Sequence, residues 1–121
     1  MTSMYRNRDL LDLAARSPRC MMCQRPNDRT VVPAHSNALR HGKGMGIKAH
    51  DLPAFLCRAC HDEVDGRAGT YQKPMREALW ADAMFFTFLW LLQEGHLQVV
   101  VNPAQPAATP GTTPLPIHPV P

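Results

Sequence analysis

The sequence predicts a small α+β domain that packs against one long C-terminal helix. Three features lead to this fold class: two Cys-x2-Cys pairs, two short apolar runs typical of strands, and one long apolar stretch with helical spacing. Within the 121 residues, the segment 102–121 is rich in proline and small side chains. It has too little apolar surface to offset the entropy of ordering, so we expect a disordered Pro-rich tail. The remainder is close to the size at which one hydrophobic core is only just sufficient.

Residues 1–18 are expected to form a short N-terminal helix, separate from the domain at residues 19–101. Asn7 or Ser3 could cap the first turn of this helix, and Pro18 would end it.

Two short strands and a second helix should follow a turn-rich segment. Residues 30–32 predict the first strand, with Pro33 near its end or at a sheet edge. The polar loop at residues 36–51 contains three glycines, which argue against regular structure there. Residues 54–56 predict the second strand, and a helix is expected to start around Arg58.

The longest helix is predicted at roughly residues 71–94, after a break at residues 66–70 and before a stop at Gly95. Its wide apolar face favours core packing or a homodimer over stacking with nucleic-acid bases. Residues 97–101 are a candidate for a final strand.

Charge is distributed unevenly along a chain whose net charge is only +3. Residues 19–48 carry six basic side chains and one acidic one, whereas residues 49–95 carry four basic and seven acidic ones. This asymmetry suggests one face for a polyanion. An ordinary solvated surface is the alternative.

No apolar run is long enough to cross a membrane, and the start of the chain does not resemble a signal peptide. We therefore expect no membrane association and a reducing, cytoplasmic location. In that setting paired Cys-x2-Cys motifs bind metal more often than they form disulfides.

The strongest motif is one Cys-x2-Cys pair followed, after 33 residues, by another. Four thiolates suit tetrahedral zinc, since each pair directs two sulfurs to one point. We expect one structural Zn2+ held by Cys20, Cys23, Cys57 and Cys60. Free or redox-active thiols and disulfides are the alternatives.

Histidines stand beside both halves of this motif. His61 follows Cys60 directly, and on a helix it shares a face with Asp65, a spacing with which two side chains can hold one metal ion. His35 follows the first predicted strand. From spacing alone His35 could be a hydrogen-bonding strand-end histidine, His61 a partner of a zinc-bound sulfur, and Asp65 an exposed helix acid.

At these positions the sequence resembles the His-Asn-His (HNH) endonucleases, whose core is a ββα-metal finger. Within that superfamily it looks most like the YbcO-like phage and prophage nuclease-domain proteins. The resemblance covers about residues 19–95. It is carried by residues 20–23, 34–37, 42–49, 51–52 and 56–65.

The resemblance implies a zinc-stapled ββα-metal finger that hydrolyses DNA phosphodiester bonds with a second divalent ion, Mg2+, Mn2+ or another. His35 falls where the family has its general base, and His61 and Asp65 fall on its helix metal ligands. Asp51 takes roughly the place of the middle asparagine, which orients the histidine, and Asn37 is a rival for that role.

The chain departs from the family pattern at Ala34, where many members carry a metal-binding Asp or His. The missing ligand would then come from Asn37, His50, Asp51 or water, or would not be replaced at all. The departure favours the alternative of a non-catalytic, zinc-containing nucleic-acid-binding module. A protein-interaction adaptor is a third reading, suggested by the apolar helix and the proline-rich tail.

Contacts with DNA are expected from basic side chains around the polar loop. Glycines let backbone amides approach a phosphate, and neighbouring lysines supply charge. The glycine- and lysine-containing segment at residues 42–48 could equally be a plain flexible loop. The expected nucleic-acid-binding residues are Arg40, Lys43, Lys48 and Arg58.

Overall fold

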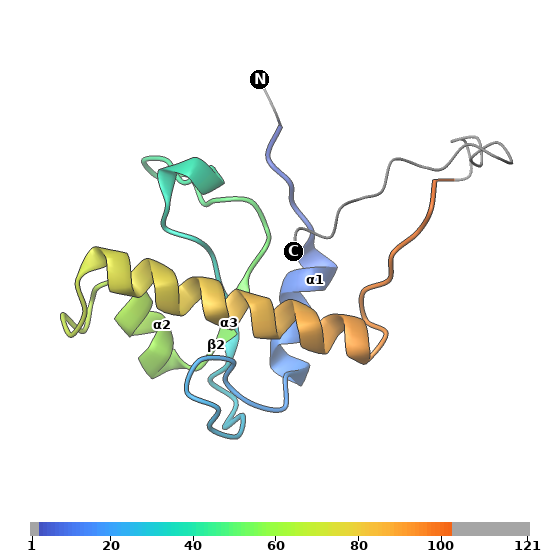
Figure 1. Ribbon diagram of the computed structural model, residues 1–121, viewed down its shortest axis with the longest axis horizontal. Coiled ribbons are helices and arrows are strands. Elements are labelled where there is room, and N and C mark those ends of the chain that lie inside the picture. The colour runs from blue at the N-terminus through green and yellow to red at the C-terminus, as the bar shows by residue number, and fades with distance from the viewer. Residues whose placement is uncertain (1–2, 103–121) are drawn as a thin grey trace, which may run out of the picture.

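The computed structural model describes residues 3–102 (Figure 1). The predicted disordered tail therefore lies, apart from its first residue, outside the described residues. The elements are α1 (Arg8–Asp12), the 3-10 helix η1 (Leu13–Arg16), β1 (Val32–Ala34), the 3-10 helix η2 (Leu39–His41), β2 (Ala54–Leu56), α2 (Arg58–Val64) and α3 (Lys73–Gln93). The small α+β class is confirmed.

The N-terminal helix begins where the capping signal predicts. The side chain of Asn7 accepts a hydrogen bond from the amide of Leu10, which satisfies a free donor of the first turn. The helix is shorter than expected, because after Asp12 it continues as the 3-10 helix η1. Leu10 and Ala14 are buried in the same core as β2 and α3, so this helix packs onto the domain.

The sheet consists of β1 and β2 in antiparallel register, with Val32 opposite Leu56 and Ala34 opposite Ala54. The first strand starts two residues later than the sequence suggested, and Pro33 lies in its middle. Each strand of a two-stranded sheet is an edge, so a residue without an amide proton is tolerated there. β2 is buried at all three positions and forms the centre of the core.

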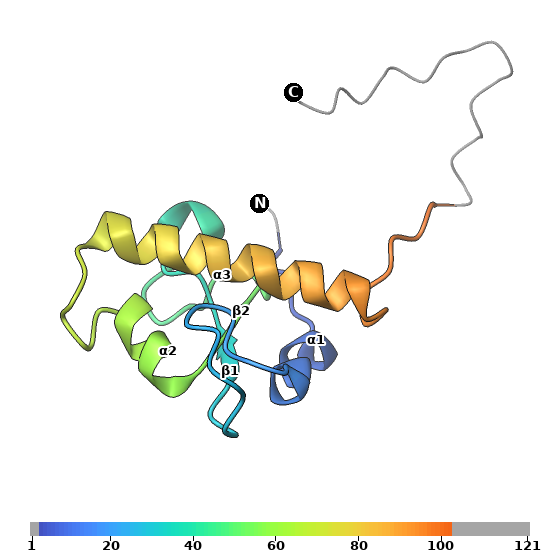
Figure 2. The ribbon, with the colours of Figure 1, turned by 60° about the horizontal axis from the view of Figure 1, so that its bottom comes forward.

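Helix α3 runs across the sheet, with α1, α2 and both strands on one side of it (Figure 2). Thr87 is fully buried, and its hydroxyl accepts from the Phe55 amide at 3.0 Å and donates to the Ala83 carbonyl at 2.8 Å. Trp80 donates its indole N–H to the Ala34 carbonyl at 2.8 Å. These bonds join α3 to both strands and fix the helix relative to the end of β1.

The outer side of α3 leaves Phe85, Phe86, Leu89 and Leu92 exposed. A homodimer through this face stays a prediction. Gly95 ends the helix in the left-handed region, at φ +75°, as expected. No helix within residues 3–102 is long and apolar enough to cross a membrane.

The strand expected at residues 97–101 is absent, so that prediction was wrong. The amides of His96 and Leu97 bond back to the Leu91 carbonyl, and the chain then leaves the domain (Figure 1, orange). Val99, Val100 and Val101 are at least 80% exposed. β-branched residues favour a strand only where a neighbouring strand is present to pair with them.

Candidate metal centre and adjoining cleft

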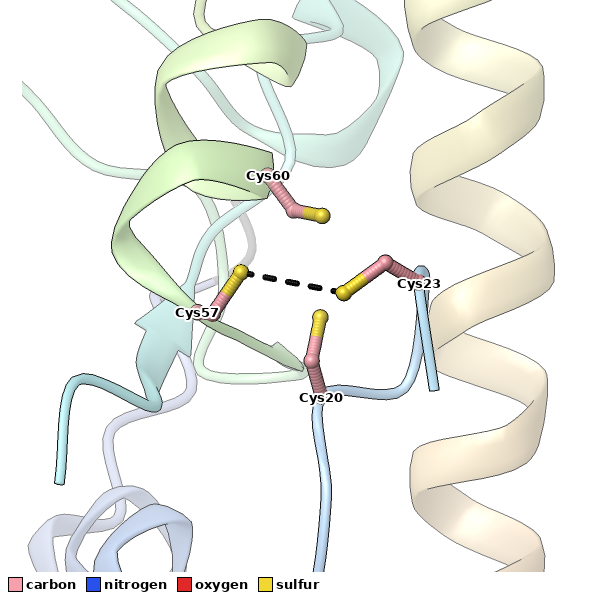
Figure 3. A group of neighbouring side chains, drawn as sticks. All are labelled: Cys20, Cys23, Cys57 and Cys60. Carbon is pink, nitrogen blue, oxygen red and sulfur yellow. Dashed lines mark hydrogen bonds between the residues drawn. The ribbon is translucent and has the colours of Figure 1, made fainter. Parts of the chain in front are cut away.

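Four cysteine sulfurs meet between the turn at residues 20–23 and the start of α2. All four lie within 4.8 Å of one another, and the sulfurs of Cys23 and Cys57 are 3.9 Å apart (Figure 3). Sulfurs about 2.3 Å from a tetrahedral ion would be about 3.8 Å apart. The cysteines are not joined as disulfides. The cluster is therefore of the right size to hold a metal ion, and a sulfur-only donor set is consistent with structural zinc.

Local backbone geometry directs these sulfurs inward. The amide of Cys20 donates to the Arg25 carbonyl at 2.9 Å, and the amide of Gln24 donates to the Cys20 carbonyl at 3.0 Å. Gln24 adopts a left-handed conformation, φ 66°, which closes the turn. On the other side Cys57 caps α2, so that Cys60 lies in the first helical turn.

The pKa values of the thiols in this cluster are shifted in different directions. Burial acts to raise the pKa of Cys20, but hydrogen bonds from the backbone of Cys23, Cys57 and Met22 outweigh it and bring the pKa to about 7. Burial, together with the negative charge of Cys20, raises the pKa of Cys60. Several thiolates are thus unfavourable here without a cation, which is the electrostatic situation that a bound metal resolves.

His35 lies directly after β1 and is held by a buried carboxylate. Its Nε2 is 2.7 Å from Oδ1 of Asp51, and the two side chains are only 12% and 5% exposed. Burial acts to raise the pKa of Asp51, but hydrogen bonds from His35, the Asn7 amide and Arg6 lower it below its usual value. The ionised carboxylate can only accept, so Nε2 of His35 carries the proton of this bond.

An N-terminal strap, residues 5–7, holds the loop that carries Asp51. Arg6 donates to Oδ1 of Asp51 at 3.0 Å and to the carbonyls of Lys48 and Ala49. The Asn7 amide donates to Oδ2 of Asp51 at 2.8 Å. The Tyr5 amide donates to Nδ1 of His50 at 2.9 Å, and the Tyr5 carbonyl accepts from the Asp51 amide at 2.9 Å.

The strap is a part of the site that the sequence does not indicate. Its partners lie 42 to 46 residues away, and no local pattern marks Arg6 as more than a surface charge. The strap also explains the position of His50. That residue was a candidate for the missing metal ligand, but its Nδ1 accepts the Tyr5 amide.

His61 and Asp65 share one face of α2, as their spacing predicts. Nε2 of His61 is 3.1 Å from Oδ2 of Asp65. The same carboxylate accepts from Asn37 at 2.8 Å and pairs with Arg67 at 2.8 Å. Burial acts to raise the pKa of Asp65, but these bonds and the charges of His61 and Arg67 lower it to about 2.

One cleft of about 230 Å³ brings the two predicted histidines together. His35 reaches it from the end of β1 and His61 from α2, while Asp51 lies behind His35. The cleft also contains a carboxylate, an amide and two ammonium groups near these rings. The predicted site residues that line it are His35, Asn37, Lys43, Lys48, His61 and Asp65.

Other expected residues lie away from the cleft. Arg40 pairs with Glu77 of α3 at 3.3 Å, and Arg58 is exposed at the start of α2. Neither lines the cleft. Ala34 is fully buried. Within residues 3–102, the cysteines are the one group of three or more His, Cys, Asp and Glu ligand atoms close enough to surround an ion.

Comparison with protein-family models, curated proteins and solved structures gives no match to this chain. A function can therefore be proposed only from the residues of the site and their geometry.

Proposed function

We propose that this protein is a phage- or prophage-type HNH endonuclease that hydrolyses DNA phosphodiester bonds with the help of a divalent metal ion. The observation that supports this best is the shared cleft. It combines a histidine suited to act as a base, a histidine–carboxylate pair suited to hold a metal, and two lysines suited to bind phosphate. In metal-assisted hydrolysis of a phosphodiester, a base activates the attacking water, a metal ion stabilises the developing charge, and cationic side chains bind the phosphate oxygens.

The structural ion is proposed to be Zn2+, bound by the four cysteines. The distance of 3.9 Å between the sulfurs of Cys23 and Cys57 suits tetrahedral sulfur coordination. The same centre fixes the start of α2, because Cys57 and Cys60 belong to its cap and first turn. Zinc would thereby hold His61 in position without taking part in the reaction.

His35 is proposed to take a proton from the attacking water. Its Nε2 is engaged with Asp51, which leaves Nδ1 as the ring atom that can accept a proton. Once the ring is protonated, the carboxylate of Asp51 at 2.7 Å stabilises the positive charge. Asp51 thus orients the base, the role that the resemblance assigned to this position, while Asn37 instead bonds Asp65.

His61 and Asp65 are proposed to hold the divalent ion. Two protein side chains are enough for Mg2+ or Mn2+ at such a site, since substrate phosphate and water complete the coordination. The ion would polarise the phosphate and stabilise the leaving oxygen. Lys43 and Lys48 line the same cleft and would hold the phosphate oxygens against these residues.

The test is nicking of supercoiled plasmid DNA in the presence of Mg2+ or Mn2+. The wild-type protein should nick, and His35→Ala should lose activity with unchanged zinc content. His96→Ala is a matched control, because His96 is exposed and contacts Trp90 at the far end of α3. Equal nicking by the wild-type protein and His35→Ala would overturn the role of His35.

A second candidate is a zinc-containing nucleic-acid-binding module without catalysis. Two observations favour it: position 34 is a buried alanine with no ligand atom, and both oxygens of Asp65 already have protein partners. Binding of plasmid DNA without nicking under either metal would select this alternative.

A further inference from the structure

We propose that a second basic groove continues the cleft on the other side of His35 and holds the DNA backbone, with Arg8 of α1 as a phosphate contact. This inference rests on the proposed binding of DNA. It adds the N-terminal helix, which takes no part in the family resemblance, to the binding surface.

The groove is an open hollow of about 540 Å³ between α1 and the loop around Ile47. Both His35 and Lys48 line this groove, and both also line the smaller cleft that contains His61. The two hollows therefore meet at His35. A strand whose phosphate lies at His35 must continue in both directions, and the groove offers the second direction.

The charge of the groove suits a polyanion. Arg6, Arg8 and Lys48 line it, against a single acid, Asp51. Asp51 is 5% exposed and is paired with Arg6 at 3.0 Å, so its charge is both buried and offset. Positive charge thus dominates the solvent-facing part of the groove, which attracts phosphate and steers it toward His35.

Arg8, unlike Arg6, is available to bind a ligand in the groove. Arg6 is committed to the carbonyls of Lys48 and Ala49 and to Asp51. The side chain of Arg8 is 85% exposed, and its one ion pair with another residue in the described range 3–102 is a 3.5 Å contact with the exposed Asp12. Exposed pairs of this kind contribute little, so a phosphate can replace Asp12 as the partner of the guanidinium.

Apolar side chains complete the groove. Leu11 of α1 and Ile47 of the facing loop both line it, and Ile47 is 52% exposed. Deoxyribose offers apolar surface between successive phosphates, so a charged contact flanked by aliphatic ones is compatible with a nucleic-acid backbone.

The experiment measures binding of a short fluorescent DNA duplex over a salt series, without added Mg2+ or Mn2+. It compares the wild-type protein with Arg8→Gln, Arg8→Lys and Arg16→Gln. Arg16 is a matched control because it is also exposed and close to the N-terminus but lies outside the groove. Zinc content and circular dichroism check that each variant is folded.

We expect Arg8→Gln to weaken binding to all DNA sequences alike and to reduce the slope of log K against log salt by about 1. Arg8→Lys should restore most of the slope, and Arg16→Gln should match the wild-type protein. If Arg8→Gln and Arg16→Gln bind equally, the groove is not a binding surface although the proposed function stands. If the wild-type protein binds no DNA even after Mg2+ or Mn2+ is added, the proposed function fails and the groove with it.

Discussion

Nε2 of His35 lies 2.7 Å from Oδ1 of Asp51, and both side chains are largely buried at the floor of the proposed site. The carboxylate that faces the imidazole is itself held by Arg6 and by the Asn7 amide. The ring orientation at the end of β1 is therefore determined by residues from the N-terminal segment and from the loop before β2. The cysteine cluster positions His61 at the start of α2, whereas this second network positions His35.

Replacing Asp51 by asparagine should impair the base while keeping the size of the side chain. The amide oxygen can still accept from the ring and orient it, but without a negative charge it stabilises a protonated imidazole less than the carboxylate does, so we expect nicking to fall by about tenfold. Stability should fall by about 1–3 kcal/mol, because Arg6 and the Asn7 amide lose a charged acceptor. Plasmid nicking and urea unfolding measure the two effects. Asp9→Asn, at an exposed acid of α1, is the control, and equal loss in both variants would contradict the role of Asp51.

Arg6→Ala should loosen the loop that carries Lys48 and Asp51. The guanidinium bonds two carbonyls and the Asp51 carboxylate, and we expect the free energy of unfolding to fall by about 2 kcal/mol. Hydrogen exchange should show faster opening of the amide of Asp51, which bonds the Tyr5 carbonyl. The same measurements on Arg16→Ala should show no change. An unaltered exchange rate at Asp51 in Arg6→Ala would mean that the strap does not hold the loop.

These networks differ in how well the sequence predicts them. The cysteine cluster could be predicted because the two cysteines of each Cys-x2-Cys pair are close in sequence. The contact between the two pairs was the one long-range contact that had to be inferred. The pairing of His61 with Asp65 follows from helical spacing. By contrast, the contact between Arg6 and Asp51 joins residues 45 apart, and neither residue has a local pattern that indicates the other.

The error at residues 97–101 has a related cause. A run of β-branched residues predicts a strand only on the assumption that a partner edge is available. Among the described residues the sheet consists of β1 and β2 alone, and the amides after α3 return to the Leu91 carbonyl. Pro33 shows the converse, since a residue that disfavours central strands lies in the middle of β1 because β1 is itself an edge.

The lowered pKa of Asp65 predicts a dependence of stability on acidity. The pKa is about 2 in the folded protein and near 3.8 when unperturbed, so below about pH 4 the unfolded chain binds the extra proton. Asp65 should therefore contribute about 2 kcal/mol at neutral pH, a contribution lost as the pH falls from about 4 to 2. The measurement is the difference in unfolding free energy between the wild-type protein and Asp65→Asn across this range. If the difference in unfolding free energy between the two proteins stays constant with pH, the pKa of Asp65 is not lowered in the folded protein.

Cys60→Ser should show whether the metal is needed for folding. A structural zinc ion contributes about 10–16 kcal/mol in small zinc-binding domains, and loss of one sulfur weakens that binding. We expect the wild-type protein to contain one zinc per chain, and Cys60→Ser to contain little and to lose α2 and the adjoining cleft. Elemental analysis and circular dichroism, with reductant present throughout, provide the readouts. Ala59→Ser, an exposed neighbour on α2, controls for the new hydroxyl. A Cys60→Ser protein that is metal-free yet unfolds at the wild-type temperature would show that the cysteines hold no structural ion.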